Sequence, residues 1–156
     1  MDDRSDATVQ GLLRAEDPFA SASRRCFACG TENGRGLHMH VDLDGDRHEA
    51  SCRITLDPDL QGWDGVAHGG IVSTLMDELL CYSLNQRRPF FTVELTMRYK
   101  QVVPTGVSLT ARARRTFARG RLMHAEGEIL GPDGDLLATA QAKFLLPRVE
   151  GTSATT

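Results

Sequence analysis

A histidine, two adjacent glycines and a carboxylate stand at a spacing that can support acyl-transfer chemistry. His68, Gly69 and Gly70 open a segment of helical apolar periodicity, and Asp77 follows about two turns later. The N–H groups at a helix start are unpaired and attract negative charge, and glycine lets a ligand approach them closely. A carbonyl oxygen that becomes an oxyanion is such a ligand. The pattern predicts an oxyanion-binding helix start, with Asp77 as the reactive carboxylate.

The spacing along this helix also limits how the two groups can act together. Gly70 and Asp77 lie on nearly the same face, whereas Glu78 points to the side and Leu75 faces the core. Asp77 comes seven positions after Gly70, which corresponds to a rise of roughly 10 Å along the axis at ~1.5 Å each. One carbonyl carbon cannot touch both groups over that distance. Either the substrate lies along the helix, or the two halves of a site come from different subunits.

Composition places the chain among ordinary globular proteins. It has 156 residues and a net charge of −3, which predicts one domain without the basic surface of a nucleic-acid-binding protein. No apolar run is long enough to span a bilayer, so no membrane contact is expected. The acidic N-terminus lacks the basic start and apolar core of a signal peptide. We therefore expect a cytoplasmic protein whose cysteines are reduced thiols.

Hydrophobic periodicity predicts one long helix and about six strands. The helix runs from Gly69 to about Asn85, with one apolar stripe formed by Val72, Leu75, Met76, Leu79 and Leu80. Alternating residues and turn sequences predict strands at 37–43, 50–56, 91–99, 107–113, 123–129 and 136–146. The last four are expected to form an antiparallel meander. This pattern favours an α+β domain in which a curved antiparallel sheet wraps around the helix. The expected division is an N-terminal arm at 1–24, a domain at 25–147 and a disordered tail at 148–156.

Several motifs together resemble the acyl-CoA thioesterases of the hotdog fold, in particular the phenylacetate-pathway type. The resemblance is carried by residues 61–70 and 75–78, by 92–100 followed by Val103-Pro104, and by the later turn at 131–134. Cys26-Phe27-Ala28-Cys29-Gly30 and Gly36-Leu37 resemble an N-terminal stretch of the same family, so the similarity covers roughly residues 25 to 147. It implies hydrolysis of an acyl-CoA to free acid and coenzyme A, with no cofactor beyond the coenzyme A of the substrate.

The resemblance also implies how the site is assembled. Hotdog thioesterases are dimers, or dimers of dimers, whose sheets join and whose sites lie at the interface. We therefore expect Gly69 or Gly70 of one chain to face Asp77 of its partner across a two-fold axis. Asp77 would act as general base or as nucleophile, and the sequence leaves both open.

Three further residues are expected beside Asp77. Gln61 and Thr92 are the expected helpers: one orients water or substrate, and the other holds Asp77 or the water. His68 either contacts the thioester or, as we prefer, holds the loop before the helix by bonding the backbone.

Four basic residues are candidates for binding the phosphates of coenzyme A. Arg98, Lys100, Arg112 and Arg114 are expected on the polar face of two strands joined by a tight turn. Like charges opposite each other across strands are unfavourable, and an anionic ligand would relieve them. The equally strong alternative is a solvated face neutralised by Glu94, Glu126 and Glu128.

Other reactive residues have simpler interpretations. Cys26 and Cys29 could form a zinc site with His38 and His40, but the set lacks standard finger spacing. We expect a turn there and no metal. Ser73 and Cys81 are expected to be small packing residues, not nucleophiles.

Alternative functions for the same pocket are hydrolysis of acyl carrier protein thioesters and non-catalytic binding of acyl-CoA. A hydratase or dehydratase would need an Asp/His pair acting on the β-carbon, and the Asp77-centred pattern fits that poorly.

Overall fold

The computed structural model describes residues 23–148, so nearly all of the predicted arm (1–24) and tail (148–156) lie outside the described residues. The elements in chain order are η1 (Ser23–Arg25), β1 (Val41–Asp44), β2 (Glu49–Thr55), η2 (Pro58–Leu60), β3 (Gln61–Trp63), β4 (Val66–Ala67), α3 (Gly69–Ser83), β5 (Phe91–Tyr99), β6 (Ser108–Arg119), β7 (Leu122–Leu130) and β8 (Leu136–Leu145). Within this part of the chain, no helix is long and apolar enough to cross a membrane.

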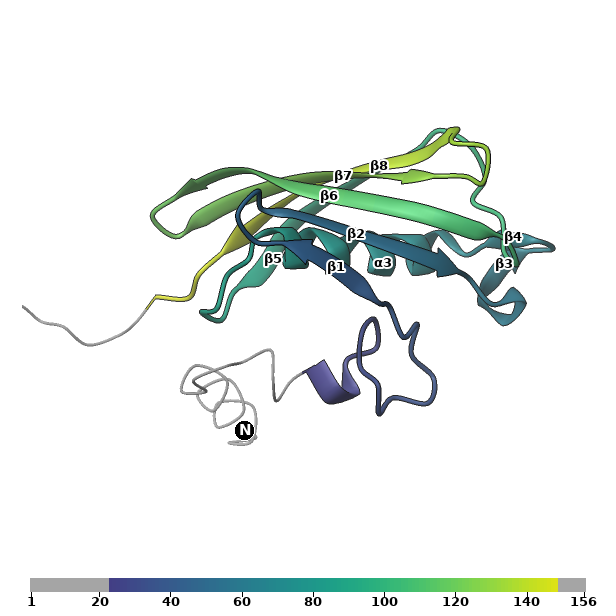
Figure 1. Ribbon diagram of the computed structural model, residues 1–156, viewed down its shortest axis with the longest axis horizontal. Helices are drawn as coiled ribbons and strands as arrows, with labels where there is room; N and C mark the ends of the chain where they lie inside the picture. The colour runs from purple at the N-terminus through teal and green to yellow at the C-terminus, as the bar shows by residue number, and fades with distance from the viewer. Residues whose placement is uncertain (1–22, 149–156) are drawn as a thin grey trace, which may run out of the picture.

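One antiparallel sheet and one helix make the body of the molecule. The sheet has six strands in the order β1-β2-β6-β7-β8-β5, and β3 and β4 form a separate hairpin. Helix α3 lies along one face of this sheet (Figure 1), and each of the six strands contacts it. The predicted α+β architecture, a curved sheet around one long helix, is confirmed.

The core forms because α3 buries its apolar stripe against a sheet face of small residues. All five predicted stripe residues are at most 1 % exposed. Opposite them the strands present mainly alanines and one glycine, and a Cβ at Gly127 would lie 2.6 Å from the Met76 methyl carbon. Small side chains here let the helix come close to the sheet, and the large residues on the helix fill the space between.

The predicted four-strand meander is wrong in one connection. Only β6, β7 and β8 follow one another; β5 pairs with β8 at the far edge, and β6 pairs with β2. The Pro104-Thr105-Gly106 turn does not close a hairpin, because its N–H groups bond elsewhere. Thr105 donates to Gly65 O at 3.0 Å, and Gly106 donates to Leu56 O at 2.9 Å. These bonds lead the chain past the β3–β4 hairpin, from the edge strand β5 to the position beside β2 where β6 begins.

The first predicted strand is also shorter than expected. Strand β1 begins at Val41, and the preceding residues leave the extended conformation at His38, where φ is +49°. Met39 instead donates its N–H to Ala28 O at 2.9 Å, and both residues are buried. The alternation at 37–40 therefore reports packing against the cysteine-containing loop, not membership of the sheet.

Candidate active site

Asp77 is half-buried on α3 and is held by one hydroxyl. The Thr92 side chain donates a hydrogen bond to Asp77 Oδ1 at 2.8 Å. Burial raises the pKa of Asp77 above its ordinary value, and the Thr92 bond partly opposes that rise by favouring the charged form. Among the described residues no basic side chain forms an ion pair with Asp77. Such a carboxylate is a stronger base than a solvated one, and its second oxygen has no hydrogen-bond partner within residues 23–148.

A β-bulge in β5 turns Thr92 toward this carboxylate. The alternation at 91–99 predicts Thr92 on the same face as Thr96 and Arg98, away from the helix. In the structure the register with β8 shifts between Thr92 and Glu94, which leaves Val93 as the extra residue. Thr92 therefore pairs with the inward-facing Phe144. Bulges commonly re-aim a side chain beside a functional site in this way.

The helix start, at the other end of the site, is capped by His68. Its Nδ1 accepts a hydrogen bond from the Gly70 N–H at 2.9 Å, which matches the preferred role of holding the backbone. The Gly69 N–H has no hydrogen-bond partner among residues 23–148. Of the two predicted oxyanion donors, Gly69 is thus the one whose amide is available in this state.

Tyr99 lies over the same helix start and is a residue that sequence reasoning missed. Its hydroxyl donates to Gly69 O at 2.6 Å and lies 2.9 Å from Ser73 Oγ. Ser73 itself donates to Gly69 O at 3.0 Å, so it is bound locally and has no activating base among these contacts. The sequence does carry one signal for this contact. Tyr99 is the last residue of an alternating strand and belongs to the set of side chains that face the helix.

A small hollow opens beside this helix start. It has a volume of about 290 Å³ and is lined by Gly69, Tyr99 and Lys100 together with valines of the neighbouring loops. Lys100 is the one predicted phosphate-binding residue among those that line it.

Gln61 stabilises the loop that leads to the helix. It lies on β3, and its Oε1 accepts from the Gly65 N–H at 3.1 Å, which closes the β3–β4 hairpin. Its contact in this chain is therefore with the backbone, and it reaches neither Asp77 nor Thr92 by a hydrogen bond.

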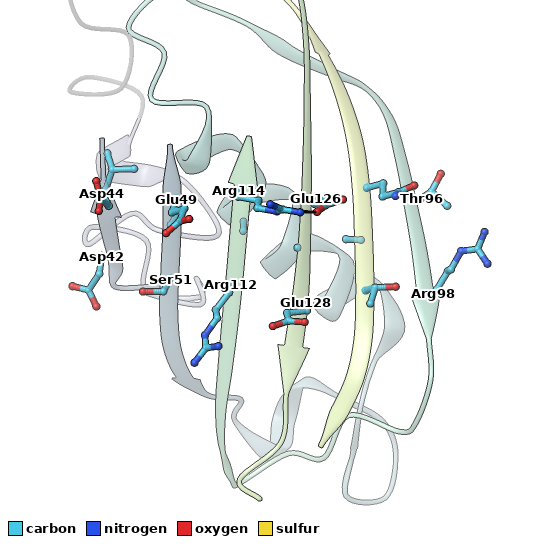
Figure 2. A pocket seen from close by; sticks show the side chains of 17 residues that line it. Asp42, Asp44, Glu49, Ser51, Thr96, Arg98, Arg112, Arg114, Glu126 and Glu128 are labelled. Atoms are coloured by element: carbon cyan, nitrogen blue, oxygen red, sulfur yellow. Dashed lines mark hydrogen bonds and ion pairs between the residues drawn. The ribbon is translucent and has the colours of Figure 1, made fainter. Parts of the chain in front are cut away.

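The other three predicted phosphate ligands lie on the sheet face away from α3. Arg98, Arg112 and Arg114 line a hollow of about 890 Å³ there, as Figure 2 shows. The expectation that these arginines lie on neighbouring strands is wrong, because β7 and β8 separate β6 from β5. Three strand spacings of ~4.8 Å put the two sets about 14 Å apart.

Acidic residues on the same sheet neutralise part of this outer face. Arg114 Nε donates to Glu126 Oε1 at 2.9 Å, Arg112 lies in register with Glu128, and Lys143 pairs with Glu94 at 2.9 Å. The geometry favours the alternative of a solvated, neutralised face. The larger hollow includes neither Asp77 nor the helix start, so its size carries no argument for catalysis.

The two cysteines at 26 and 29 meet a different partner from those considered. Cys26, Cys29 and Glu78 bring their ligand atoms within 4.8 Å of one another, and His38 and His40 are not part of that group. The third member comes from α3, so spacing near the cysteines could not reveal it.

Cys81 is a poor nucleophile, because burial raises the pKa of its thiol.

The arrangement thus has two halves on one helix. Gly69 and Asp77 are eight residues apart, which corresponds to ~12 Å of helix rise. One half can accept negative charge on an oxygen, and the other can take a proton or attack a carbon. Together these are the requirements for hydrolysing an activated carbonyl.

Known proteins share both the sequence pattern and the fold. Residues 64–138 match the family model described as the thioesterase superfamily, which includes the helix start, Asp77 and Thr92. No curated protein matches the chain closely enough to count as a relative.

Several solved structures share the architecture. One described as a thioesterase superfamily protein, RHA08564, has a TM-score of 0.72 at 24% identity over 78% of this chain and 63% of its own. The PaaI protein of the phenylacetic acid degradation operon of Escherichia coli has a TM-score of 0.64 at 20% identity, covering 70% of this chain and 83% of its own. An N33D mutant of the phenylacetic acid degradation protein PaaI from Thermus thermophilus has a TM-score of 0.64 at 23% identity, covering 84% of this chain and 100% of its own. This chain therefore spans less than two thirds of the first of these proteins.

The class of protein follows from these observations. The six-stranded sheet around a single helix is the hotdog fold. Within it, the segment that bears the site matches the thioesterase superfamily, and the expected resemblance to PaaI-like hotdog thioesterases is confirmed. The protein has the hotdog fold, and residues 64–138 of it match the thioesterase superfamily.

Proposed function

We propose that this protein hydrolyses acyl-CoA thioesters to the free acid and coenzyme A, with no other cofactor. The observation that carries the proposal is the Asp77–Thr92 pair: a half-buried carboxylate with a raised pKa, held at 2.8 Å and lacking a basic partner among the described residues. The match of this segment to the thioesterase superfamily supports the same chemistry.

Each half of the site has one task in this reaction. The thioester oxygen accepts a hydrogen bond from the Gly69 N–H, which stabilises the negative charge that develops there. In the general-base route, Asp77 takes a proton from the water that attacks the carbonyl carbon. In the nucleophile route, Asp77 attacks that carbon itself, and water then hydrolyses the resulting anhydride. In both routes the C–S bond breaks, and the coenzyme A thiolate leaves and takes up a proton.

The position of β5 favours a site shared between two chains. Strand β5 is an edge strand of the sheet, and Phe91, Val93 and Tyr99 are 45–50 % exposed on it. Its first part holds Asp77 through Thr92, and its last residue, Tyr99, contacts Gly69. If two copies of β5 pair antiparallel with Thr92 opposite the partner's Tyr99, each Asp77 faces the partner's Gly69. A two-fold axis between Leu95 and Thr96 would then generate two equivalent sites.

Lys100 is the residue that we retain as a phosphate contact. It lines the hollow beside Gly69, so an anionic group of coenzyme A entering this hollow would meet a positive charge.

The test is a panel of acyl-CoA thioesters assayed for thiol release with wild type and Asp77→Asn. Loss of a general base is expected to lower kcat by ~10²–10⁴-fold for every substrate that the wild type hydrolyses. Asp42→Asn, which changes an exposed carboxylate on β1, serves as the matched control and should retain wild-type rates. Circular dichroism verifies that each variant is folded.

Three results would contradict the proposal. Full turnover in Asp77→Asn would show that Asp77 is not the catalytic carboxylate. Binding of acyl-CoA by the wild type without thiol release would indicate a binding domain. Hydrolysis of acyl carrier protein thioesters alone would assign a different substrate class.

A further inference from the structure

A folded loop carries two thiols onto the side of α3. Residues 26–40 precede β1, and their backbone is closed by hydrogen bonds from Gly30 N–H to Cys26 O at 2.9 Å and from Leu37 N–H to Phe27 O at 2.8 Å. Ala28 and Met39 anchor the loop in the core at 3 % and 4 % exposure. The loop is thereby fixed against α3. Cys26 and Cys29 belong to the first turn of the loop and lie on the same side of that turn.

The helix contributes a carboxylate to the same point. Cys26 Sγ lies 3.7 Å from Glu78 Oε1, and the ligand atoms of Cys26, Cys29 and Glu78 all lie within 4.8 Å of one another. A tetrahedral ion with Zn–S of about 2.3 Å and Zn–O of about 2.1 Å would separate a sulfur ligand from an oxygen ligand by roughly 3.6 Å. The Cys26 Sγ–Glu78 Oε1 distance of 3.7 Å is close to this separation, and the other two pairs of ligand atoms lie within 4.8 Å.

The carboxylate of this cluster has no cationic partner among the described residues. None of the ion pairs formed by the described residues includes Glu78. A carboxylate and two thiols that converge without a cation are the donor set that a borderline-soft divalent ion prefers.

We propose that Cys26, Cys29 and Glu78 bind one Zn²⁺ ion, with water in the fourth tetrahedral position, and that the ion fastens the loop at 26–40 to α3. All three side chains are half-buried, which leaves the ion accessible to water on one side. The ion would hold the helix at Glu78, the residue next to Asp77. Its role is structural, and the proposed hydrolysis requires no step on it.

The first test measures zinc in the full chain, purified under reducing conditions without chelators, by elemental mass spectrometry. We expect close to one equivalent per chain, with loss of zinc from Cys26→Ser and Glu78→Gln. Two matched controls, Cys52→Ala in the core and Glu94→Gln on β5, should retain it. Removal of zinc from the wild type should lower the Tm, and re-addition of Zn²⁺ should restore it.

The second test needs no variant and therefore does not depend on how the variants fold. Alkylation by iodoacetamide, read by peptide mass spectrometry, should modify Cys26 and Cys29 much faster after zinc removal. The proposal is overturned if reduced wild type neither contains zinc nor takes it up from a Zn²⁺ solution. Equal zinc content in Cys26→Ser, or equal alkylation with and without zinc, would overturn it as well.

Discussion

At the scale of single residues, the proposed chemistry rests on Asp77 and the Thr92 hydroxyl that holds it. Asp77 is moved toward the neutral form by burial and back toward the charged form by Thr92. Because Asp77 must be ionised to act as base or nucleophile, activity rises with pH through its pKa, which lies above the ordinary 3.8. The acid limb of the pH profile is therefore expected to report the pKa of Asp77, which burial raises and the Thr92 bond lowers.

Removing that hydroxyl is expected to shift the acid limb in a defined direction. Thr92→Val deletes the donor that favours the charged carboxylate, so the pKa of Asp77 rises and the acid limb of kcat/KM moves to higher pH. Thr92→Ser keeps a donor and should leave the limb close to that of the wild type. The measurement is kcat/KM for one acyl-CoA across pH. An unshifted acid limb in Thr92→Val would show that the hydroxyl does not govern the ionisation of Asp77.

At the scale of elements, two local irregularities position the site. The bulge at Val93 turns Thr92 toward α3, and the His68 cap sets the start of that helix. Both depart from regular patterns: the first breaks strict alternation, and the second uses an imidazole where Ser, Thr, Asp or Asn is usual. Periodicity alone predicts the elements but not these departures.

The cap makes a prediction about stability. His68→Ala removes the acceptor for the Gly70 N–H and is expected to lower the free energy of unfolding by ~1 kcal/mol. His68→Asn supplies another side-chain acceptor at the same position and should recover most of the loss. Urea denaturation at one fixed protein concentration measures both. An equal loss in the two variants would show that the cap bond is not what His68 contributes.

At the scale of the whole molecule, the central question is which chain completes each site. The helix separates Gly69 from Asp77 by ~12 Å, and β5 runs between the two half-sites at the edge of the sheet. In the dimer that we propose, antiparallel pairing of this edge with a second copy would bring opposite halves together. The isolated chain carries both halves without joining them.

Subunit complementation tests this arrangement. Gly69→Pro removes the free N–H at the first helical position, where proline is well tolerated, and Gly69→Ala is the control that keeps it. Alone, Gly69→Pro is expected to lose ~10²–10³-fold in kcat, as for an oxyanion-hole donor. Mixed with Asp77→Asn, it should form heterodimers with one intact site each, so a statistical mixture should regain about a quarter of wild-type activity. Activity that stays at the sum of the two parents would place each site within one chain.

Local sequence was enough to predict the helix, the strand segments and the candidate residues, because these depend on periodicity and residue type. The apolar stripe of α3, the hairpin from β1 to β2 and the choice of Asp77 as the candidate carboxylate could all be read in this way. The family resemblance was likewise readable from contiguous motifs, and the match over residues 64–138 confirmed it.

Which distant residues meet was settled by tertiary contacts alone. Strand order separated Arg98 from Arg112 and Arg114, and a one-residue bulge turned Thr92 to Asp77. Docking of the N-terminal loop brought Cys26 and Cys29 to Glu78, fifty-two positions after Cys26. In each case, backbone hydrogen bonds and the burial of surface decide which segments, distant in the sequence, lie next to one another. Periodicity within one segment carries no information about that choice. The helix start and Asp77 were thus evident from local pattern, whereas their neighbours depended on the fold.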